Sequence, residues 1–209
     1  STQGSIVAGA LAPHPPHLVY AENPPQNEPN AECGWEMLRW GYERMRKDLD
    51  ALDYDCIVVL SPHWQTYIGN HILGVERFES LSVDPIFPNL FRYHYELDVD
   101  VELAEAIHRE AQADKLTTKM MRNPDFRVDY GTIVSCHLTN PTWDKPIVGI
   151  SSCRATDFYS VEVMQEQARR LGEATRRAIE ASGKKVVLLA SNSLSHRHFV
   201  TESPLPEDM

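Results

Sequence analysis

The stretch Cys56-Ile57-Val58-Val59-Leu60-Ser61-Pro62-His63 is a short apolar run that leads directly into a histidine. Similar runs, over residues 6–11 and 186–190, precede His14 and His196. Apolar, β-branched runs of this length are typical of strands that are covered on both faces of a sheet. Ligands of open α/β sheets bind beyond the carboxyl ends of the strands. The sequence therefore predicts a site formed by His14, His63 and His196, most simply around a metal ion.

Helical segments alternate with these apolar runs. Apolar residues spaced by three and four positions predict a helix over residues 34–52. Asp100 and Ser160 are suitable N-caps for helices over residues 101–113 and 161–181. Such an alternation implies crossover connections, and hence an α/β fold with a mainly parallel sheet covered by helices in three layers.

The remaining segments complete this expected sheet. Short strands are predicted at residues 71–75, 116–121 and 147–151, and an irregular loop with some extended structure is predicted at residues 83–95. One helix connects the strand at residues 6–11 to the strand at residues 56–60, so these two strands are expected to be neighbours. The proline before His63 is expected to end its strand and to present the imidazole.

Length and charge limit the possible functions. The chain has 209 residues, and we expect residues 1–209 to form a single α/β catalytic domain. No helix follows the apolar run at residues 186–190, so we expect this domain to be truncated at its C-terminus. The net charge of -10 disfavours nucleic acid and anionic membranes as partners. No apolar stretch approaches the roughly 20 residues that span a bilayer, so a cytoplasmic protein is expected.

The histidines have different surroundings. Prolines stiffen the segment Ala12-Pro13-His14-Pro15-Pro16-His17, which suits a metal ligand at His14 better than at His17. Taken alone, His63 is equally compatible with a ligand and with a structural histidine. His196 is compatible with a third ligand of a zinc site or with a proton-transfer group near an iron. Two imidazoles and one carboxylate would form an iron facial triad, but no carboxylate follows a strand here.

Four motifs occur in an order that resembles a known family. They are Ala12-Pro13-His14-Pro15-Pro16-His17, Ser61-Pro62-His63-Trp64, Asp129-Tyr130-Gly131-Thr132 and Ser191-Asn192-Ser193-Leu194-Ser195-His196. Together they resemble the class III extradiol ring-cleavage dioxygenases, the superfamily of the protocatechuate 4,5-dioxygenase catalytic subunit. The segments at residues 22–29, 83–89 and 119–124 are most similar to the members that cleave aminophenols.

This resemblance implies a function and a set of roles. It implies an enzyme that uses non-haem Fe(II) and O2 to open 2-aminophenol or a related catechol to a muconic semialdehyde. His14 and His63 match the two iron-ligating histidines, and His196 matches the acid/base histidine. Tyr130 falls where many relatives have a histidine, and would contact the ring hydroxyl of the substrate or the bound oxygen. The third ligand of the family is a glutamate that would lie beyond Met209.

The resemblance also implies a partner, and the residues leave two alternative functions open. The resemblance implies association with a homologous α subunit or self-association. Two other functions remain open at this point. The first is a zinc-dependent hydrolase with His14, His63 and His196 as ligands. The second is a non-catalytic scaffold subunit of the same fold.

Overall fold

The computed structural model describes residues 2–19, 35–86, 88 and 92–193. In chain order, its helices and strands are β1 (Ser5–Pro13), the 3-10 helix η1 (Pro16–Val19), α1 (Trp35–Asp50), β2 (Cys56–Thr66), β3 (Asn70–Leu73), β4 (Arg77–Val83), β5 (Arg92–Asp98), α2 (Val101–Ala113), β6 (Thr118–Met121), α3 (Tyr130–Thr139), β7 (Ile147–Cys153), α4 (Val161–Ser182) and β8 (Lys185–Asn192).

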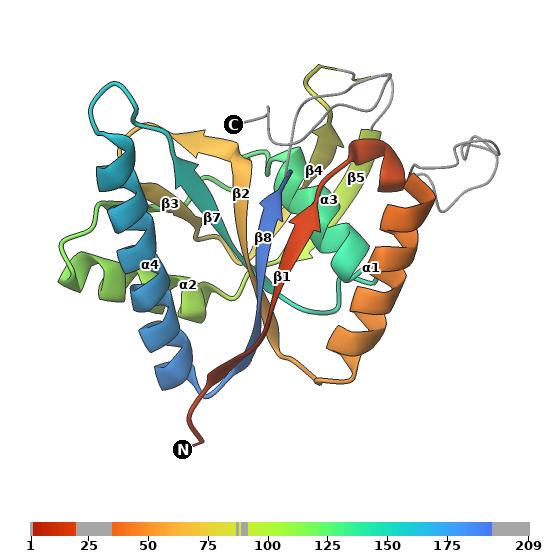
Figure 1. Cartoon of the computed structure of the whole chain (residues 1–209), viewed down its shortest axis with the longest axis horizontal. Helices are drawn as coiled ribbons and strands as arrows, with labels where there is room; N and C mark the ends of the chain where they lie inside the picture. Colours follow the sequence, from red (N-terminus) through yellow and green to blue (C-terminus); the bar gives the residue numbers. More distant parts are fainter. Residues whose placement is uncertain (1, 20–34, 87, 89–91, 194–209) are drawn as a thin grey trace, which may run out of the picture.

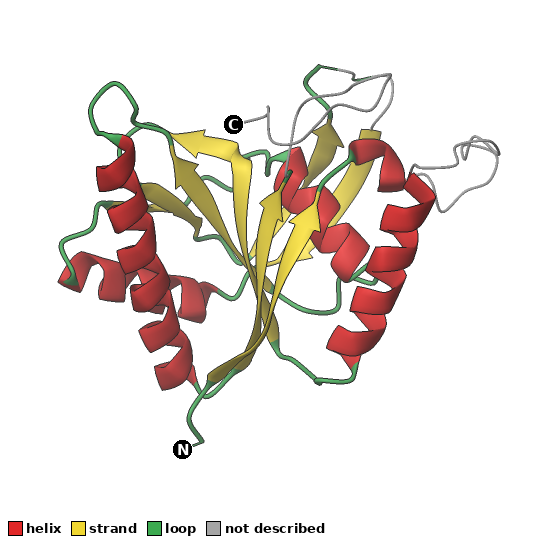
Figure 2. Cartoon of the chain, in the orientation of Figure 1, coloured by secondary structure: helices red, strands yellow, loops and turns green. Residues whose placement is uncertain are grey.

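Six strands form a central sheet in the order β1-β8-β2-β7-β3-β6. All neighbours in this sheet are parallel except β3 and β7, which pair antiparallel. Helices α2 and α4 cover one face, and α1 and α3 cover the other (Figure 1; Figure 2). The prediction of a mainly parallel α/β sheet between helical layers is therefore confirmed.

Side chains of β2 alternate between the two faces of this sheet. Ile57 and Val59 belong to the core under α1 and α3, whereas Cys56 and Val58 belong to the core under α2 and α4. All four are fully buried. A strand buried on both faces has a continuous apolar sequence, and this is why residues 56–60 could be assigned from the sequence.

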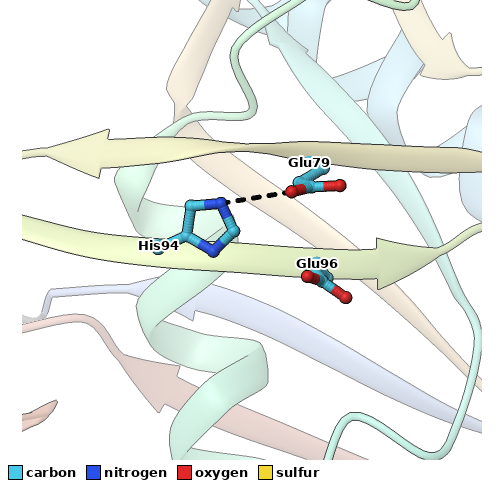
Figure 3. A group of neighbouring side chains, drawn as sticks. All are labelled: Glu79, His94 and Glu96. Carbon is cyan, nitrogen blue, oxygen red and sulfur yellow. Dashed lines mark ion pairs between the residues drawn. The ribbon is translucent and has the colours of Figure 1, made fainter.

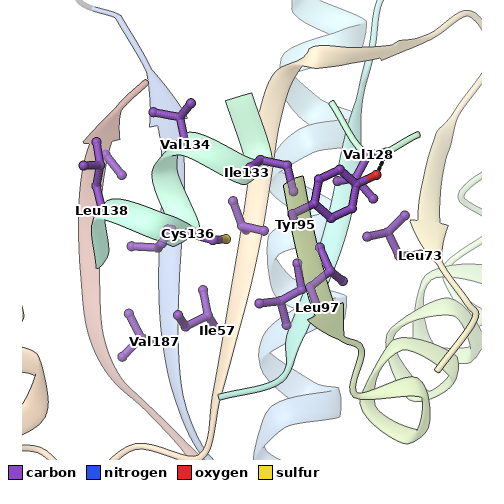
Figure 4. Close-up of a cluster of buried hydrophobic side chains, with 14 of the residues drawn as sticks. Ile57, Leu73, Tyr95, Leu97, Val128, Ile133, Val134, Cys136, Leu138 and Val187 are labelled. Carbon is purple, nitrogen blue, oxygen red and sulfur yellow. Dashed lines mark hydrogen bonds between the residues drawn. The ribbon is translucent and has the colours of Figure 1, made fainter. Parts of the chain in front are cut away.

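The core under α3 is completed by a second, two-stranded sheet made of β4 and β5. Figure 4 shows Tyr95 and Leu97 of β5 in the same buried cluster as Ile133 of α3, and the Tyr95 hydroxyl accepts a hydrogen bond of 2.9 Å from the backbone N–H of Val128. The end of β4 and the start of β5 replace the two ends of the irregular loop predicted at residues 83–95, whereas residues 84–86 lie outside strands, as predicted. In β5, buried Tyr95 and Leu97 alternate with exposed residues, a period of two that is short and easily missed.

Helix α3 was not predicted. Most of its residues are buried on every side, so its sequence lacks the apolar stripe of a surface helix. The signal that was present is its N-cap, Asp129, whose carboxylate accepts hydrogen bonds from the backbone N–H of Thr132 (3.0 Å) and from the Thr132 hydroxyl (2.8 Å). The predicted caps Asp100 and Ser160 are confirmed, because each side chain accepts from the backbone N–H three residues later.

Two expectations about β1 and β2 are wrong. The two strands are not neighbours, because β8 lies between them and pairs with both. The buried apolar run of β8 lies inside the sheet, whereas β1, rich in alanine, lies at the edge. Strand β2 also does not end at Pro62. It continues to Thr66 after a register shift against β7, between Ser61 and Gln65.

Within the described part of the chain, no helix has both the length and the apolar character that crossing a membrane requires.

The burial of individual side chains predicts how much each contributes to the stability of the fold. Ile107 of α2 is fully buried, so Ile107→Ala should lower the free energy of unfolding by about 2–5 kcal/mol. The matched control is Ile68→Ala, at a side chain that is 54% exposed, and it should change stability by less than about 0.5 kcal/mol. Urea unfolding followed by circular dichroism measures both, and equal midpoints for the two variants would contradict this packing.

Candidate active site

Two histidines meet above the carboxyl end of β8. His14 follows β1 and His63 lies in β2, and their Nε2 atoms are 2.8 Å apart. The rings are nearly perpendicular, at 84°, and His14 is only 8% exposed. Neighbouring strands are about 4.8 Å apart, so residues on β1 and β2 must reach across β8 to touch. The structure therefore brings together two of the three predicted histidines, although their strands are not adjacent.

His14 is oriented from two elements. The Tyr42 hydroxyl of α1 donates a hydrogen bond to the carbonyl of Pro13, directly before His14. The Nδ1 atom of His14 lies 2.8 Å from Oγ of Ser191 in β8, and the same hydroxyl donates to the carbonyl of Gly131 at 3.2 Å. Because Ser191 has one hydroxyl hydrogen, both contacts are satisfied when Nδ1–H of His14 donates to Ser191. That tautomer leaves the Nε2 lone pair facing His63.

His63 is oriented by the register shift in β2. Pro62 has no N–H to give to the ladder, and pairing with β7 resumes only at Gln65. Strand irregularities of this kind commonly redirect a side chain beside an active site. The backbone N–H of His63 donates to Ser61 Oγ at 3.2 Å, and the Ser61 hydroxyl donates to the carboxylate of Asp129. This chain of hydrogen bonds ties His63 to the start of α3.

Tyr130, the first residue of α3, completes the cluster. Its hydroxyl lies 2.9 Å from Nε2 of His63, and its ring also contacts the ring of His14. Burial, together with the negative charges of Asp84 and Asp129, raises the pKa of Tyr130 to about 12. The phenol is therefore protonated at neutral pH and can donate a hydrogen bond.

Gly131 permits this close approach of α3 to β2. A Cβ atom at Gly131 would lie 2.6 Å from Ser61 Oγ, 3.1 Å from a carboxylate oxygen of Asp129 and 3.1 Å from the ring of His63. The first distance is shorter than a van der Waals contact, so a larger residue would push the helix and the strand apart. Asp129 thus caps α3, Tyr130 contributes its side chain to the site, and Gly131 leaves the space that α3 needs beside β2.

A cavity of about 230 Å³ opens beside His63 and Tyr130. An apolar cavity of about 150 Å³ is enough to bind benzene, so this volume suits one substituted aromatic ring. Residues of β4 and Pro85 after it also line this cavity. The lining residues are His63, Leu81, Ser82, Val83, Pro85, Arg127, Val128, Asp129 and Tyr130.

The His14–His63 pair has the spacing of two ligands of one metal ion. Nitrogen ligands about 2.1 Å from an ion are about 3.0 Å apart at a right angle and about 3.4 Å apart at a tetrahedral angle. The observed 2.8 Å is the length of a hydrogen bond between the two rings, and it brings both nitrogens close enough together to contact one ion. Among the residues that the structure describes, no third histidine, cysteine or carboxylate lies close enough to complete a three-ligand group with this pair. His196 lies outside the described residues.

A different trio of possible ligands lies on the β4–β5 hairpin. Figure 3 shows Glu79, His94 and Glu96, whose ligand atoms all lie within 4.8 Å of one another. Each side chain is more than half exposed, His94 pairs with Glu79 at 3.4 Å, and Arg77 pairs with Glu96 at 2.5 Å. Since Arg77 already offsets the charge of Glu96, we interpret this trio as a surface ion-pair network.

The other histidines in the described part of the chain lie outside the His14–His63 pair. His108 contacts the Thr118 hydroxyl through Nδ1 at 2.7 Å, and His137 contacts the Tyr93 hydroxyl through Nδ1 at 3.2 Å. Burial and the charge of Lys119 lower the pKa of His71. The side chain of His17 lies outside what the structure describes.

Sequence reasoning assigned no role to Ser61, Asp129, Gly131 or Ser191. All four occur within the motifs that contain or precede the site histidines and Tyr130. Their proximity in sequence to these residues was the available signal. Their partners, however, come from other elements, so their contacts emerge only in the folded chain.

Comparisons with known proteins show which family and relatives this chain resembles. The family described as the catalytic LigB subunit of aromatic ring-opening dioxygenase matches residues 8–209. The 2-aminophenol 1,6-dioxygenase beta subunit of a Pseudomonas species is 54% identical over 206 residues, which are 99% of this chain and 68% of that protein. The 3,4-dihydroxyphenylacetate 2,3-dioxygenase of Escherichia coli is 28% identical over 99% of this chain and 71% of its own length.

Two further comparisons are more distant. The 2-aminophenol 1,6-dioxygenase alpha subunit of a Pseudomonas species is 25% identical over 83% of this chain and 62% of its own length. The crystal structure of an uncharacterized protein from Escherichia coli K12 has a TM-score of 0.50 and 18% identity, and the match covers 75% of this chain and 54% of that one. The latter likeness concerns the fold alone.

The space at Gly131 predicts a specific sensitivity. Gly131→Ala should separate α3 from β2 and lower the free energy of unfolding by about 1–3 kcal/mol. Gly172→Ala in α4 is the matched control, because nothing lies within 4 Å of its added Cβ and alanine favours a helix. Thermal unfolding should therefore show a lower midpoint for the first variant and an unchanged or higher midpoint for the second. A tolerated Gly131→Ala would show that the close approach is not required.

The hydrogen bond to His14 predicts an effect on metal affinity. Ser191→Ala removes the acceptor for Nδ1–H of His14, and if His14 binds a metal ion as the sequence predicts, this loss should lower metal affinity about 10–100-fold. Ser182→Ala, at the far end of α4, should leave affinity unchanged. Competition with a chelating dye measures both dissociation constants, and equal values would refute the role of Ser191.

Proposed function

Because the chain belongs to the family of the catalytic LigB subunit of aromatic ring-opening dioxygenases, we propose that it opens the ring of 2-aminophenol or a related catechol with non-haem Fe(II) and O2. The observation that carries this proposal is the 2.8 Å separation of the Nε2 atoms of His14 and His63. The product is a muconic semialdehyde. Both oxygen atoms of O2 enter it, so no external reductant is needed.

We assign His14 and His63 as the two histidine ligands of the iron. Their Nε2 atoms are close enough to bind one ion, and the Ser191 contact favours the tautomer that can bind metal through Nε2 of His14. A carboxylate outside the described residues would complete the 2-His-1-carboxylate triad of non-haem Fe(II) oxygenases. When bound, the iron would bring the aromatic substrate and O2 together and carry the electron transfer that O2 chemistry requires.

Two side chains would act on the substrate. The protonated hydroxyl of Tyr130, 2.9 Å from Nε2 of His63, would donate a hydrogen bond to an oxygen atom of the substrate or of O2. His196 would remove a proton from the substrate as it binds and return a proton during ring opening. This role for His196 rests on the resemblance of its motif.

The alternatives that the sequence left open receive less support. The match to a family of ring-opening dioxygenases disfavours a three-histidine zinc hydrolase. A non-catalytic scaffold would not require the Ser191 and Ser61 hydrogen bonds that orient the two imidazoles. Membership in a family of catalytic dioxygenase subunits also favours the enzyme.

We infer two features of the larger organisation. Residues 1–209 act as one catalytic domain, because both buried cores are built on the same sheet. The chain associates with a homologous subunit or with itself. The support for this is that chains named as beta and alpha subunits of one dioxygenase are both similar to it.

Substitutions test the assigned roles. His14→Ala and His63→Ala should each lose bound iron in the intact enzyme, because each removes one of two histidine ligands. His196→Ala should retain iron but lower kcat about 10²–10⁴-fold, the usual contribution of a general acid–base group. His108→Ala, whose ring contacts Thr118 away from the pair, should change neither quantity.

Iron content by mass spectrometry and O2 uptake with 2-aminophenol measure these effects. Anaerobic purification that yields zinc without iron would favour the hydrolase. Unchanged iron content in His14→Ala or His63→Ala would refute the ligand assignment, and unchanged turnover in His196→Ala would remove its proton-transfer role.

A further inference from the structure

Ser135 of α3 is a fully buried serine that lies against the carboxyl ends of two strands. Its hydroxyl donates a hydrogen bond of 2.8 Å to Oγ of Ser191 in β8, and it also lies 3.1 Å from the carbonyl oxygen of Ala12 in β1. Ala12 and Ser191 are register partners across these two strands. Ser135 therefore contacts both strands at the level where the chain leaves β1 toward His14.

The helical spacing of α3 explains why Ser135 reaches Ser191. Gly131 and Ser135 are four residues apart, so they lie on the same face of the helix, one turn from each other. The carbonyl of Gly131 accepts a hydrogen bond of 3.2 Å from the Ser191 hydroxyl, and the Ser135 hydroxyl contacts the same Ser191 oxygen from the next turn. Two consecutive turns of α3 thus hold one hydroxyl of β8.

The contacts around Ser191 decide which ring nitrogen of His14 carries the hydrogen. A serine hydroxyl has one hydrogen and two lone pairs. When Ser135 donates to Ser191, it fills one lone pair, and the Ser191 hydrogen goes to the carbonyl of Gly131. When Ser135 donates to Ala12 instead, the Ser191 hydrogen can go to Ser135. Either arrangement leaves a lone pair of Ser191 facing Nδ1 of His14, 2.8 Å away, so Nδ1 carries the hydrogen.

We propose that Ser135 is a positioning residue, which acts through Ser191 to hold His14 in the tautomer whose Nε2 can bind a metal ion. Without the Ser135 hydroxyl, the Ser191 hydroxyl loses one of its two partners in α3, and its hydrogen can turn toward Nδ1 of His14. Nε2 would then carry the ring hydrogen and could not bind a metal. In metal sites, the partner of the second ring nitrogen fixes the tautomer of a ligating histidine. This role rests on the proposed function, in which His14 binds iron.

Nitrogen-15 NMR of the imidazoles tests the tautomer directly, in protein treated with a chelator and at a pH where the rings are neutral. The signals of His14 are those that His14→Ala lacks. In the wild-type protein, Nδ1 should give the signal of a nitrogen that carries hydrogen, and Nε2 that of a bare nitrogen. Ser135→Ala should move both signals toward the opposite tautomer, and alanine favours the helix, so the variant should fold. A bare Nδ1 in the wild-type protein, or unchanged signals in the variant, would overturn the proposal.

Metal affinity separates this role from a structural one. Under anaerobic conditions, competition with a chelating dye should show that Ser135→Ala weakens Fe(II) binding about fivefold, the factor that one hydrogen bond contributes. Thr139→Ala is the matched control, because Thr139 is a buried hydroxyl residue of the same helix that donates to the carbonyl of Ser135 at 2.8 Å. The control should leave the dissociation constant and the His14 signals unchanged. An equal loss of affinity in the two variants would indicate a structural role and overturn the proposal.

A double variant tests the route through Ser191. Because Ser135 acts on His14 only through this residue, Ser135→Ala combined with Ser191→Ala should bind Fe(II) no more weakly than Ser191→Ala alone. Additive losses of affinity would overturn the route.

The NMR measurement also distinguishes failure of this proposal from failure of the proposed function, because it needs neither metal nor turnover. If the tautomer of His14 depends on Ser135 but the wild-type protein binds no Fe(II), the control of the tautomer stands and the iron-dependent function fails. If the wild-type protein binds Fe(II) and opens 2-aminophenol but the tautomer does not depend on Ser135, the function stands and the positioning role fails.

Discussion

The contact between the start of α3 and the irregular part of β2 is the constraint on which the site depends. Gly131 allows the helix to approach the ring of His63, and the Ser61 hydroxyl bridges the strand to Asp129, the cap of the same helix. The segment Asp129-Tyr130-Gly131 therefore determines where α3 begins, where Tyr130 lies and how closely α3 approaches His63. A residue larger than glycine would disturb all three, because they share a few ångströms of space.

Strand β8, which lies between β1 and β2, is the second element on which this arrangement depends. It separates β1 from β2, and Ser191 at its carboxyl end orients His14 while contacting the carbonyl of Gly131. The two imidazoles therefore meet over β8 and share a hydrogen-bond network with α3. The carboxyl ends of parallel strands lie at one edge of a sheet. At this edge, hydrogen bonds connect β1, β2, β8 and α3 around the two histidines.

The β4–β5 hairpin contributes part of the lining of the cavity beside His63 and Tyr130. Tyr95 and Leu97 of β5 belong to the buried core, and the C-terminal part of β4, which contains Ser82, lines the cavity. The same small sheet thus contributes to stability and to the space where a ring would bind. On its exposed face, Glu79, His94 and Glu96 take part in surface ion pairs, which shows that closeness of ligand-type residues alone does not identify a metal site (Figure 3).

The sequence by itself determined the α/β class, the main strands and helices, the caps at Asp100 and Ser160, and the pairing of His14 with His63. Apolar runs, capping residues and proline-flanked histidines are local signals, so they can be recognised without the fold. Only the tertiary structure decided that β8 lies between β1 and β2, that residues 130–139 form a buried helix, and that Ser191, Ser61 and Ser82 line or support the site. These features depend on partners distant in sequence, and a helix buried on all sides has no amphipathic pattern to reveal it.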